Sequence, residues 1–235
     1  MKLRLDKYLA NMGLGTRSEV KKAITKGLAE VNGAVVKKPE GKVDTETDEI
    51  RYQGKTVGYI SYEYYMLNKP AGVISATEDP RQRTVIDLIS GRHRDDLFPV
   101  GRLDKDTEGL LLITNDGALA HRLLSPKKHV DKIYYARIQG VVTAADAESF
   151  AVGLDIGDEK RTLPAKLDIL ESGEISKIRV TVREGRFHQV KRMFQAVGKE
   201  VIYLKRLQMG SLKLDENLET GAYRELTKEE MEALC

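Results

Sequence analysis

Residues 101–117 read Gly-Arg-Leu-Asp-Lys-Asp-Thr-Glu-Gly-Leu-Leu-Leu-Ile-Thr-Asn-Asp-Gly. A charged loop that carries Asp104 and Asp106 leads directly into the apolar run Leu110–Ile113, which predicts a buried strand. The polar triplet at 115–117 then predicts a turn at the end of that strand. Loops held by a rigid element often carry function, so we expect a functional site around these two aspartates.

The chain from residue 59 onward has more strand-like patterns than helical ones. Strands are predicted at 62–67, 110–113, 132–139, 165–170, 177–182 and 201–207, and short helices at 84–89, 118–123, 144–151 and 189–197. Thr227 and Glu230 have the spacing of a capping box and predict one more short helix. Several strands follow one another too closely for parallel crossovers. We therefore predict that residues 59–235 form one α+β domain with a mixed, mainly antiparallel sheet.

Residues 1–58 predict a separate small domain made of two short helices and a hairpin. The apolar spacing from Leu5 to Met12 fits a helix, and Thr16 with Glu19 can cap a second one. The dipeptide Asn32-Gly33 accepts the positive φ angles of a type I′ turn and joins strands at 28–31 and 34–36. Residues 39–58 are expected to finish this domain and to lead into a linker.

Positive charge is concentrated in the first domain. Residues 1–38 carry nine Lys or Arg and three acidic residues, a net charge of +6, whereas the whole chain carries +3. A basic region on a near-neutral body indicates an anionic partner, and nucleic acid is the first candidate. Arg17, Lys21 and Lys22 are the candidate RNA contacts here. The alternative interpretation is a charged face that is only solvated.

Composition excludes several classes of protein. With 41% hydrophobic and 32% charged residues the chain is typical of a globular protein, and no apolar run has the length of a membrane span. The first residues lack the apolar core of a signal peptide, the single cysteine is Cys235, and the four histidines lack metal-ligand spacing. We expect a cytoplasmic monomer with no membrane contact, no metal and no cofactor.

Residues 101–110 resemble the signature motif of the pseudouridine synthases, in which the aspartate at the position of Asp104 is the catalytic nucleophile. Residues 67–73, Leu-Asn-Lys-Pro-Ala-Gly-Val, resemble the opening motif of the family, and residues 183–194 resemble its Glu-Gly-Arg-x-His-Gln-Val motif. The first domain resembles a small RNA-binding module first described in a ribosomal protein. The resemblance thus implies the pseudouridine synthase fold behind an RNA-binding head.

The resemblance also implies roles for particular residues. Lys191 follows Gln-Val and would pair with the nucleophilic aspartate, and Tyr134, in a Lys-Ile-Tyr strand, would stack on the flipped uracil and accept the C5 proton. Arg102 would fill the space that the flipped nucleotide leaves. RNA contacts are further expected from Lys69, Arg186 and His188.

One carboxylate suffices for the implied chemistry. Isomerising uridine breaks the bond from N1 to C1′, and the positive charge that develops on the sugar can be stabilised or captured by a carboxylate. Covalent addition of Asp104 and abstraction of a sugar proton both stay open. For Asp106 we favour a role in capping nearby backbone amides over a glycosidase-like pair with Asp104.

The whole chain most resembles the branch of the family that modifies ribosomal RNA. This implies an isomerase that converts one uridine of ribosomal RNA to pseudouridine, with uridine 516 of 16S rRNA as the expected site. A site in 23S rRNA is the nearest alternative. Two other classes stay open: a non-catalytic RNA-binding assembly factor, and a carbohydrate hydrolase that uses both aspartates.

Overall fold

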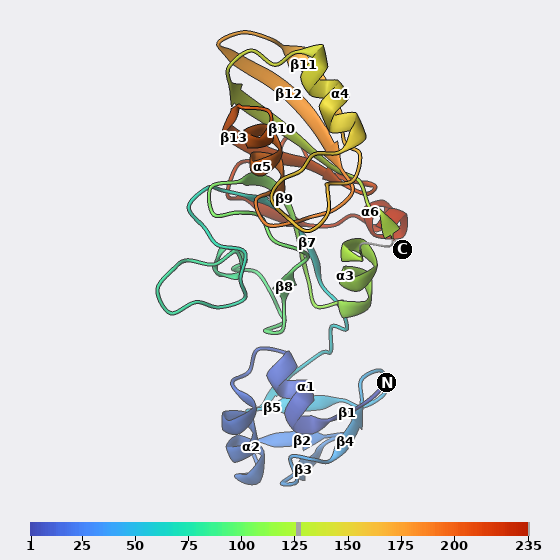
Figure 1. Cartoon of the computed structure of the whole chain (residues 1–235). Helices are drawn as coiled ribbons and strands as arrows, with labels where there is room; N and C mark the ends of the chain where they lie inside the picture. The colour runs from blue at the N-terminus through green and yellow to red at the C-terminus, as the bar shows by residue number, and fades with distance from the viewer. Residues whose placement is uncertain (126–127, 235) are drawn as a thin grey trace. The chain divides into compact units, whose positions relative to one another are not determined.

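The computed structural model describes residues 1–125 and 128–234. Contacts divide the chain into two compact units, one of Met1–Glu63 with Ser90–Leu97 and one of Tyr64–Ile89 with the chain from Phe98 onward (Figure 1). The sequence-based domain boundary after residue 58 remains a proposal. Cys235 lies outside the described residues. In the described ranges no helix has both the length and the apolar character that crossing a membrane requires.

The first unit packs two helices against short antiparallel strands. The helices are α1 (Leu5–Asn11) and α2 (Arg17–Thr25), and the strands are β1 (Lys2–Arg4), β2 (Ala29–Val31), β3 (Ala34–Val36), β4 (Lys42–Asp44), β5 (Ile50–Tyr52) and β6 (Lys55–Thr56). Strand β1 pairs with β4, and the other four form a sheet in the order β3-β2-β5-β6. One apolar cluster, which includes Leu5, Leu9, Val20 and Ile24, holds this unit together.

Most of the predicted local structure of this unit is confirmed. Thr16 and Glu19 form a complete capping box at the start of α2, and Asn32 and Gly33 have φ angles of 50° and 78° in the turn between β2 and β3. The prediction that residues 39–58 finish this domain agrees with the structure, and residues 57–63 lie in no helix or strand. Residues 39–58 contain β4, β5 and β6, and β5 pairs directly with β2.

A buried carboxylate organises the basic face of the first unit. The side chain of Asp6 is fully buried and accepts hydrogen bonds from Arg4 at 2.9 and 3.0 Å and from Arg17 at 3.3 Å. The ammonium of Lys21 lies 3.8 Å from the same carboxylate. Burial acts to raise the pKa of Asp6, but the hydrogen bond from Arg4 and the charge of Arg17 outweigh it, so the pKa of Asp6 is lowered.

The substitution Asp6→Asn is expected to destabilise the first unit by about 2 kcal/mol, because three cations lose their shared counter-ion. Since the pKa of Asp6 is lower in the folded state, this stability is present above the unfolded value of 3.8 and is lost as the pH falls through the folded pKa. Amide hydrogen exchange of α1 and α2 in the full chain measures it. Equal protection of wild type and Asp6→Asn at pH 7 would contradict the prediction.

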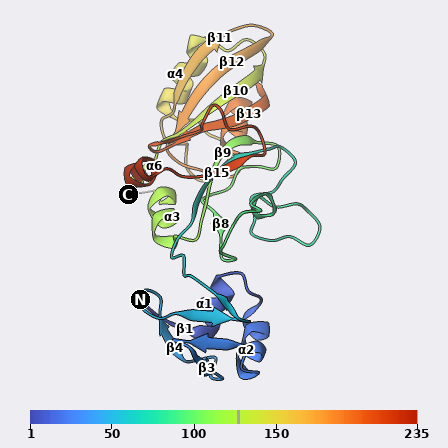
Figure 2. The same ribbon diagram turned by 180° about the vertical axis from the view of Figure 1, so that it is seen from behind.

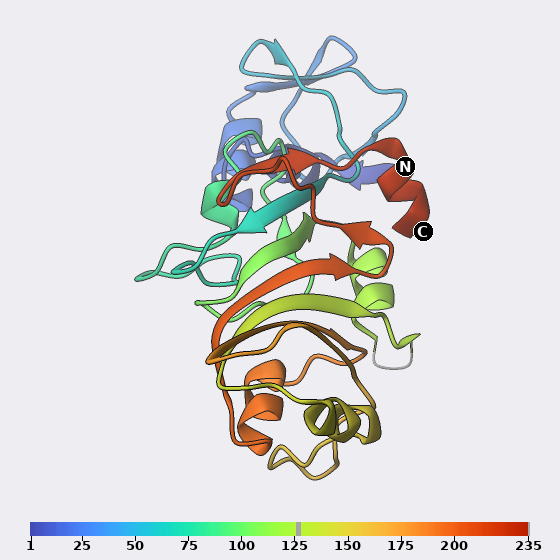
Figure 3. The ribbon, with the colours of Figure 1, turned by 90° about the horizontal axis from the view of Figure 1, so that it is seen from above.

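The second unit is built on one large sheet. Its strands are β7 (Tyr64–Lys69), β8 (Phe98–Pro99), β9 (Glu108–Thr114), β10 (Lys132–Gln139), β11 (Lys166–Glu171), β12 (Ile175–Val182), β13 (Glu200–Met209), β14 (Leu212–Lys213) and β15 (Tyr223–Glu225). The main order is β11-β12-β10-β13-β9-β7-β15, with β14 beside β13 and β8 beside β9. Only β13 and β9 are parallel among these described pairs, which confirms the predicted mainly antiparallel sheet. The strands lie side by side in Figure 3.

Short helices accompany this sheet: α3 (Gly117–Leu124), α4 (Ala144–Val152), α5 (Gln189–Ala196) and α6 (Lys228–Leu234). The predicted helix at 84–89 is only the 3₁₀ turn Ile86–Leu88. The rings of Phe150 on α4 and Phe194 on α5 lie 4.9 Å apart, so these two helices cover the same face of the sheet. Figure 2 shows the sheet from behind.

Gly109 allows the parallel contact between β9 and β13. Its φ is +98°, and a Cβ at this position would lie 2.3 Å from the carbonyl oxygen of Arg206. Arg206 itself is buried, and its Nε donates a hydrogen bond of 2.7 Å to the carbonyl of Leu110. The start of β9 is thereby fixed against β13. The loop that precedes β9 therefore ends at a rigid position.

Candidate active site

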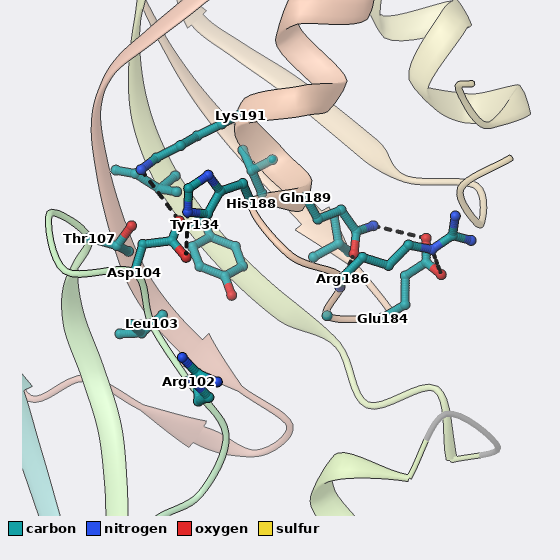
Figure 4. Close-up of a pocket in the computed structure, with 14 residues that line it drawn as sticks. Arg102, Leu103, Asp104, Thr107, Tyr134, Glu184, Arg186, His188, Gln189 and Lys191 are labelled. Atoms are coloured by element: carbon teal, nitrogen blue, oxygen red, sulfur yellow. Dashed lines mark hydrogen bonds and ion pairs between the residues drawn. The ribbon is translucent and has the colours of Figure 1, made fainter. Parts of the chain in front are cut away.

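The loop that precedes β9 lies at the edge of a pocket. Its empty volume is about 450 Å³, and it is lined by Arg102, Leu103, Asp104, Thr107, Tyr134, Val182, Glu184, Gly185, Arg186, His188, Gln189, Val190, Lys191 and Leu204. This pocket, which we call the Asp104 pocket, is therefore lined by the loop that precedes β9 and by β10, β12, β13 and the start of α5 (Figure 4). We call the loop that precedes β9 the aspartate loop.

Lys69 holds the aspartate loop through its side-chain ammonium. It is fully buried at the end of β7, and its Nζ lies within 2.9 to 3.3 Å of the carbonyls of Pro70, Asp104, Lys105 and Thr107. Burial lowers the pKa of Lys69 to about 8. The expectation that Lys69 contacts RNA is therefore wrong, because the side chain has no exposed surface. Its position makes it a cation that shapes the loop.

Asp104 is partly open and has two basic neighbours. Its side chain is 25% exposed, Lys191 Nζ lies 3.4 Å from Oδ2, and His188 Nε2 lies 3.6 Å from Oδ1. In Figure 4 the side chains of Lys191 and His188 point toward Asp104 from the α5 side of the pocket. The pairing expected between Asp104 and Lys191 is thus present in the structure.

Asp106 departs from the sequence-based interpretation. We expected it to cap backbone amides, but its carboxylate accepts two hydrogen bonds from Lys191 Nζ, at 2.6 and 2.8 Å. The hydrogen bond from Lys191 lowers the pKa of Asp106. Because Asp106 is 71% exposed, this pair is screened by water and contributes little to stability. Its effect is to hold the ammonium of Lys191 between the two aspartates.

A hydrogen-bonded frame positions the start of α5. The carboxylate of Glu184 accepts hydrogen bonds from Arg186 Nε at 3.0 Å and from Gln189 Nε2 at 2.9 Å. The remaining donors of Arg186 reach Asp158 and the carbonyls of residues 160 and 161. The expected RNA contact of Arg186 is therefore revised, because protein partners occupy its guanidinium group. Arg186 braces the segment that carries His188 and Lys191.

Tyr134 and Arg102 also line the pocket. Tyr134 is 9% exposed and points into the pocket from β10, where Figure 4 shows its ring beside Asp104. Arg102 is exposed, and none of the residues that the structure describes makes a hydrogen bond or ion pair with its guanidinium. The ring of Tyr134 thus lies beside the carboxylate, and the guanidinium of Arg102 lines another part of the same pocket.

The three candidate contacts of the first unit have different surroundings. Arg17 and Lys21 lie beside the buried carboxylate of Asp6, whereas Lys22 is exposed on α2. Arg17 and Lys21 each keep about half of their side-chain surface exposed, and Lys22 is exposed as well. All three therefore remain candidates for phosphate contacts.

Sequence reasoning missed two residues at this site. Ser75 is buried, and its Oγ donates to the carbonyl of Leu103 at 2.8 Å and accepts from the amide of Leu103 at 3.0 Å. Phe187 stacks on His188 and is 76% exposed. No local pattern could have indicated Ser75. Phe187, in contrast, is an aromatic residue between two candidate site residues, and this position could have indicated it. In the described part of the chain no cluster of three or more His, Cys, Asp or Glu could hold a metal ion.

Two family models match the chain. Residues 63–196 match the family described as RNA pseudouridylate synthase, and residues 3–50 match the S4 domain. These matches cover the Asp104 pocket almost completely and most of the first unit. They confirm the expected fold class, an S4-type head followed by a catalytic α+β fold.

Relatives match over almost the whole length. An uncharacterised RNA pseudouridine synthase of Bacillus subtilis is 49% identical over 99% of this chain and 98% of its own. The ribosomal small subunit pseudouridine synthase A of Haemophilus influenzae is 40% identical over 99% of both chains. The ribosomal large subunit pseudouridine synthase B of Bacillus subtilis is also 40% identical, over 98% and 95%. A crystal structure of a pseudouridylate synthase matches with a TM-score of 0.70 and 40% identity, over 99% of this chain and 100% of that one.

Proposed function

The chain belongs to the RNA pseudouridylate synthase family, and from this premise we propose that it converts one uridine of ribosomal RNA, uridine 516 of 16S rRNA, to pseudouridine with Asp104 as the catalytic carboxylate. The observation that carries the proposal is the position of Asp104. Its carboxylate is open to a pocket, 3.4 Å from the ammonium of Lys191, and Tyr134 lines the same pocket.

The reaction makes specific demands on such a pocket. The bond from N1 to C1′ breaks, the uracil turns, C5 bonds to C1′, and the proton on C5 leaves. The target nucleotide must first leave its stack, because a stacked base exposes neither its glycosidic bond nor its face. The carboxylate of Asp104 stabilises or captures the sugar centre while the base is detached. No water has to be activated in this sequence of steps.

Each neighbour of Asp104 has a defined task in this proposal. Lys191 places a positive charge 3.4 Å from the carboxylate of Asp104, and Asp106 holds the ammonium of Lys191 in place through its two short hydrogen bonds. The ring of Tyr134 supports the uracil while it turns, and its hydroxyl is the group we propose to receive the C5 proton. Arg102, which has no ion-pair partner among the described residues, takes the place of the flipped nucleotide and binds adjacent phosphates.

The choice of ribosomal RNA rests on the relatives and on the head. Two relatives are named for a ribosomal substrate. The synthase of Haemophilus influenzae is named for the small ribosomal subunit, and the second synthase of Bacillus subtilis is named for the large ribosomal subunit. The +6 charge of residues 1–38 suits an RNA partner. Both relatives are 40% identical to this chain, so identity alone does not separate 16S from 23S rRNA. A site in 23S rRNA is therefore the second candidate.

Mapping pseudouridines in ribosomal RNA from cells with and without this protein separates the candidates. The expected result is that a single pseudouridine, at position 516 of 16S rRNA, is lost with the protein and restored by the wild-type gene but not by an Asp104→Asn gene. Loss of a 23S pseudouridine instead would make 23S rRNA the substrate. An unchanged map of both RNAs would contradict a ribosomal substrate.

A further inference from the structure

Phe187 is a large apolar residue whose side chain is exposed to solvent beside the Asp104 pocket. It is 76% exposed, although its neighbours on both sides take part in the site. One face of its ring stacks on the imidazole of His188, with ring centroids 3.8 Å apart and planes inclined by 16°. The His188 imidazole in turn lies 3.6 Å from the carboxylate of Asp104. The exposed ring is thus connected to the reacting group through a single side chain.

A second hollow opens next to Phe187. Its empty volume is about 1080 Å³, and its lining includes Phe187, Ile74, Ser75, Gly101 and Lys105. It shares a wall with the Asp104 pocket, made of Arg102, Leu103, Asp104, Gly185, Arg186 and His188. Neither Tyr134 nor Lys191 lines this hollow. The aspartate loop and residues 185–188 therefore separate two adjoining spaces, and only the first has the groups that we assign to the target uracil.

We propose that Phe187 is a stacking platform for the base of a nucleotide adjacent to the target uridine, held in this second hollow. The inference rests on the proposed function and extends it to a second nucleotide of the same RNA. When the target uridine leaves its stack, its neighbour loses one stacking partner. The open face of Phe187 replaces that partner. Stacking of a base on an aromatic side chain favours binding with little dependence on sequence.

The shared wall provides a cation for the phosphate that joins the two nucleotides. The phosphodiester that joins the two nucleotides has to cross this wall. Arg186 is occupied by Glu184, Asp158 and two carbonyls, whereas Arg102 makes no ion pair within the described part of the chain. Arg102 is therefore the cation available to that phosphate, since a guanidinium pairs well with phosphate oxygens.

The platform is held in place before RNA arrives. His188 has a left-handed backbone, with φ 48° and ψ 34°, and its ring stacks on the ring of Phe187. The carbonyl of Phe187 accepts a hydrogen bond of 3.0 Å from Arg192, whose guanidinium also binds the carboxylate of Asp158 at 2.7 and 2.8 Å. Left-handed non-glycine residues are often found at functional sites. A fixed aromatic ring loses little conformational entropy when a base stacks on it.

The test compares Phe187→Leu with Phe187→Tyr. Leucine keeps an apolar side chain without a ring, and tyrosine keeps the ring. With a 16S rRNA transcript labelled with tritium at uridine C5, Phe187→Leu is expected to raise KM about tenfold, with kcat within about threefold of wild type. Phe187→Tyr is expected to have the KM of the wild-type protein. Both variants should unfold at the wild-type temperature, because the side chain is exposed.

The outcomes separate this inference from the proposed function. Wild-type protein that releases no tritium from either ribosomal RNA would contradict the proposed function. Active wild-type protein with an unchanged KM in Phe187→Leu would overturn the stacking platform alone. Equal increases of KM in Phe187→Leu and Phe187→Tyr would also overturn it, because the effect would then not depend on an aromatic ring.

Discussion

Asp104→Asn is expected to lower kcat for pseudouridine formation by about 1,000-fold or more, with the Kd for RNA within about threefold of wild type. The amide keeps the size and polarity of the side chain but cannot stabilise or capture the positive centre at C1′. A 1,000-fold loss corresponds to about 4 kcal/mol of transition-state stabilisation. Release of tritium from uridine C5 measures the rate, and filter binding of the same RNA measures Kd.

Asp106→Asn is the matched control. It removes a second carboxylate that binds the same ammonium, at 2.6 and 2.8 Å from Lys191 Nζ. We expect a loss of about tenfold, because Lys191 keeps its contact with Asp104 and only its position is less well fixed. Equal losses in both variants would favour a glycosidase-like pair of carboxylates. Full activity of Asp104→Asn would contradict the assigned role of Asp104.

Lys69→Met is expected to lower the free energy of unfolding by about 3 kcal/mol and kcat by about 100-fold. Methionine fills similar space without a charge, so the four carbonyls that surround Lys69 Nζ, including those of Asp104 and Thr107, lose a buried donor. A displacement of the catalytic group by about 1 Å is enough for a loss of this size. Urea unfolding and tritium release measure the two effects.

Lys105→Met is the control, because it removes a lysine from the aspartate loop itself without removing the buried ammonium beneath the loop. Lys105 is exposed, and its Nζ binds only Gln82, at 2.9 Å, among its described neighbours. Its removal should change the free energy of unfolding by less than about 0.5 kcal/mol. If Lys69→Met unfolded at the same urea concentration as Lys105→Met, the buried ammonium would not be what holds the aspartate loop.

Local sequence patterns predicted most elements because each is determined by its own residues. The run of strand-forming residues at 132–139 predicted a strand there, and the structure places β10 at the same residues. The apolar spacing on α5 and the Thr16 capping box were equally local signals. The strands β4 and β5 were missed because each is only three residues long and pairs with a segment distant in the sequence, β1 and β2 respectively.

The pair of Asp104 with Lys191 could be predicted from the motifs, but the second contact of Lys191 and the burial of Lys69 could not. Motif resemblance brought Asp104, Lys191 and His188 to one place, and the structure shows them in contact. The burial of Lys69 depends on how the loop folds over β7, which no local pattern encodes. The two hydrogen bonds from Lys191 to Asp106 join residues 85 positions apart, so spacing within the loop could not indicate them.

Counting the tritium that wild-type protein releases from ribosomal RNA transcripts labelled at uridine C5 tests the central claim most directly. The account predicts a plateau of one tritium per 16S transcript, because bonding of C5 to C1′ expels the hydrogen at C5. It also predicts that the plateau disappears with Asp104→Asn. No release from either 16S or 23S transcripts by the wild-type protein would contradict it.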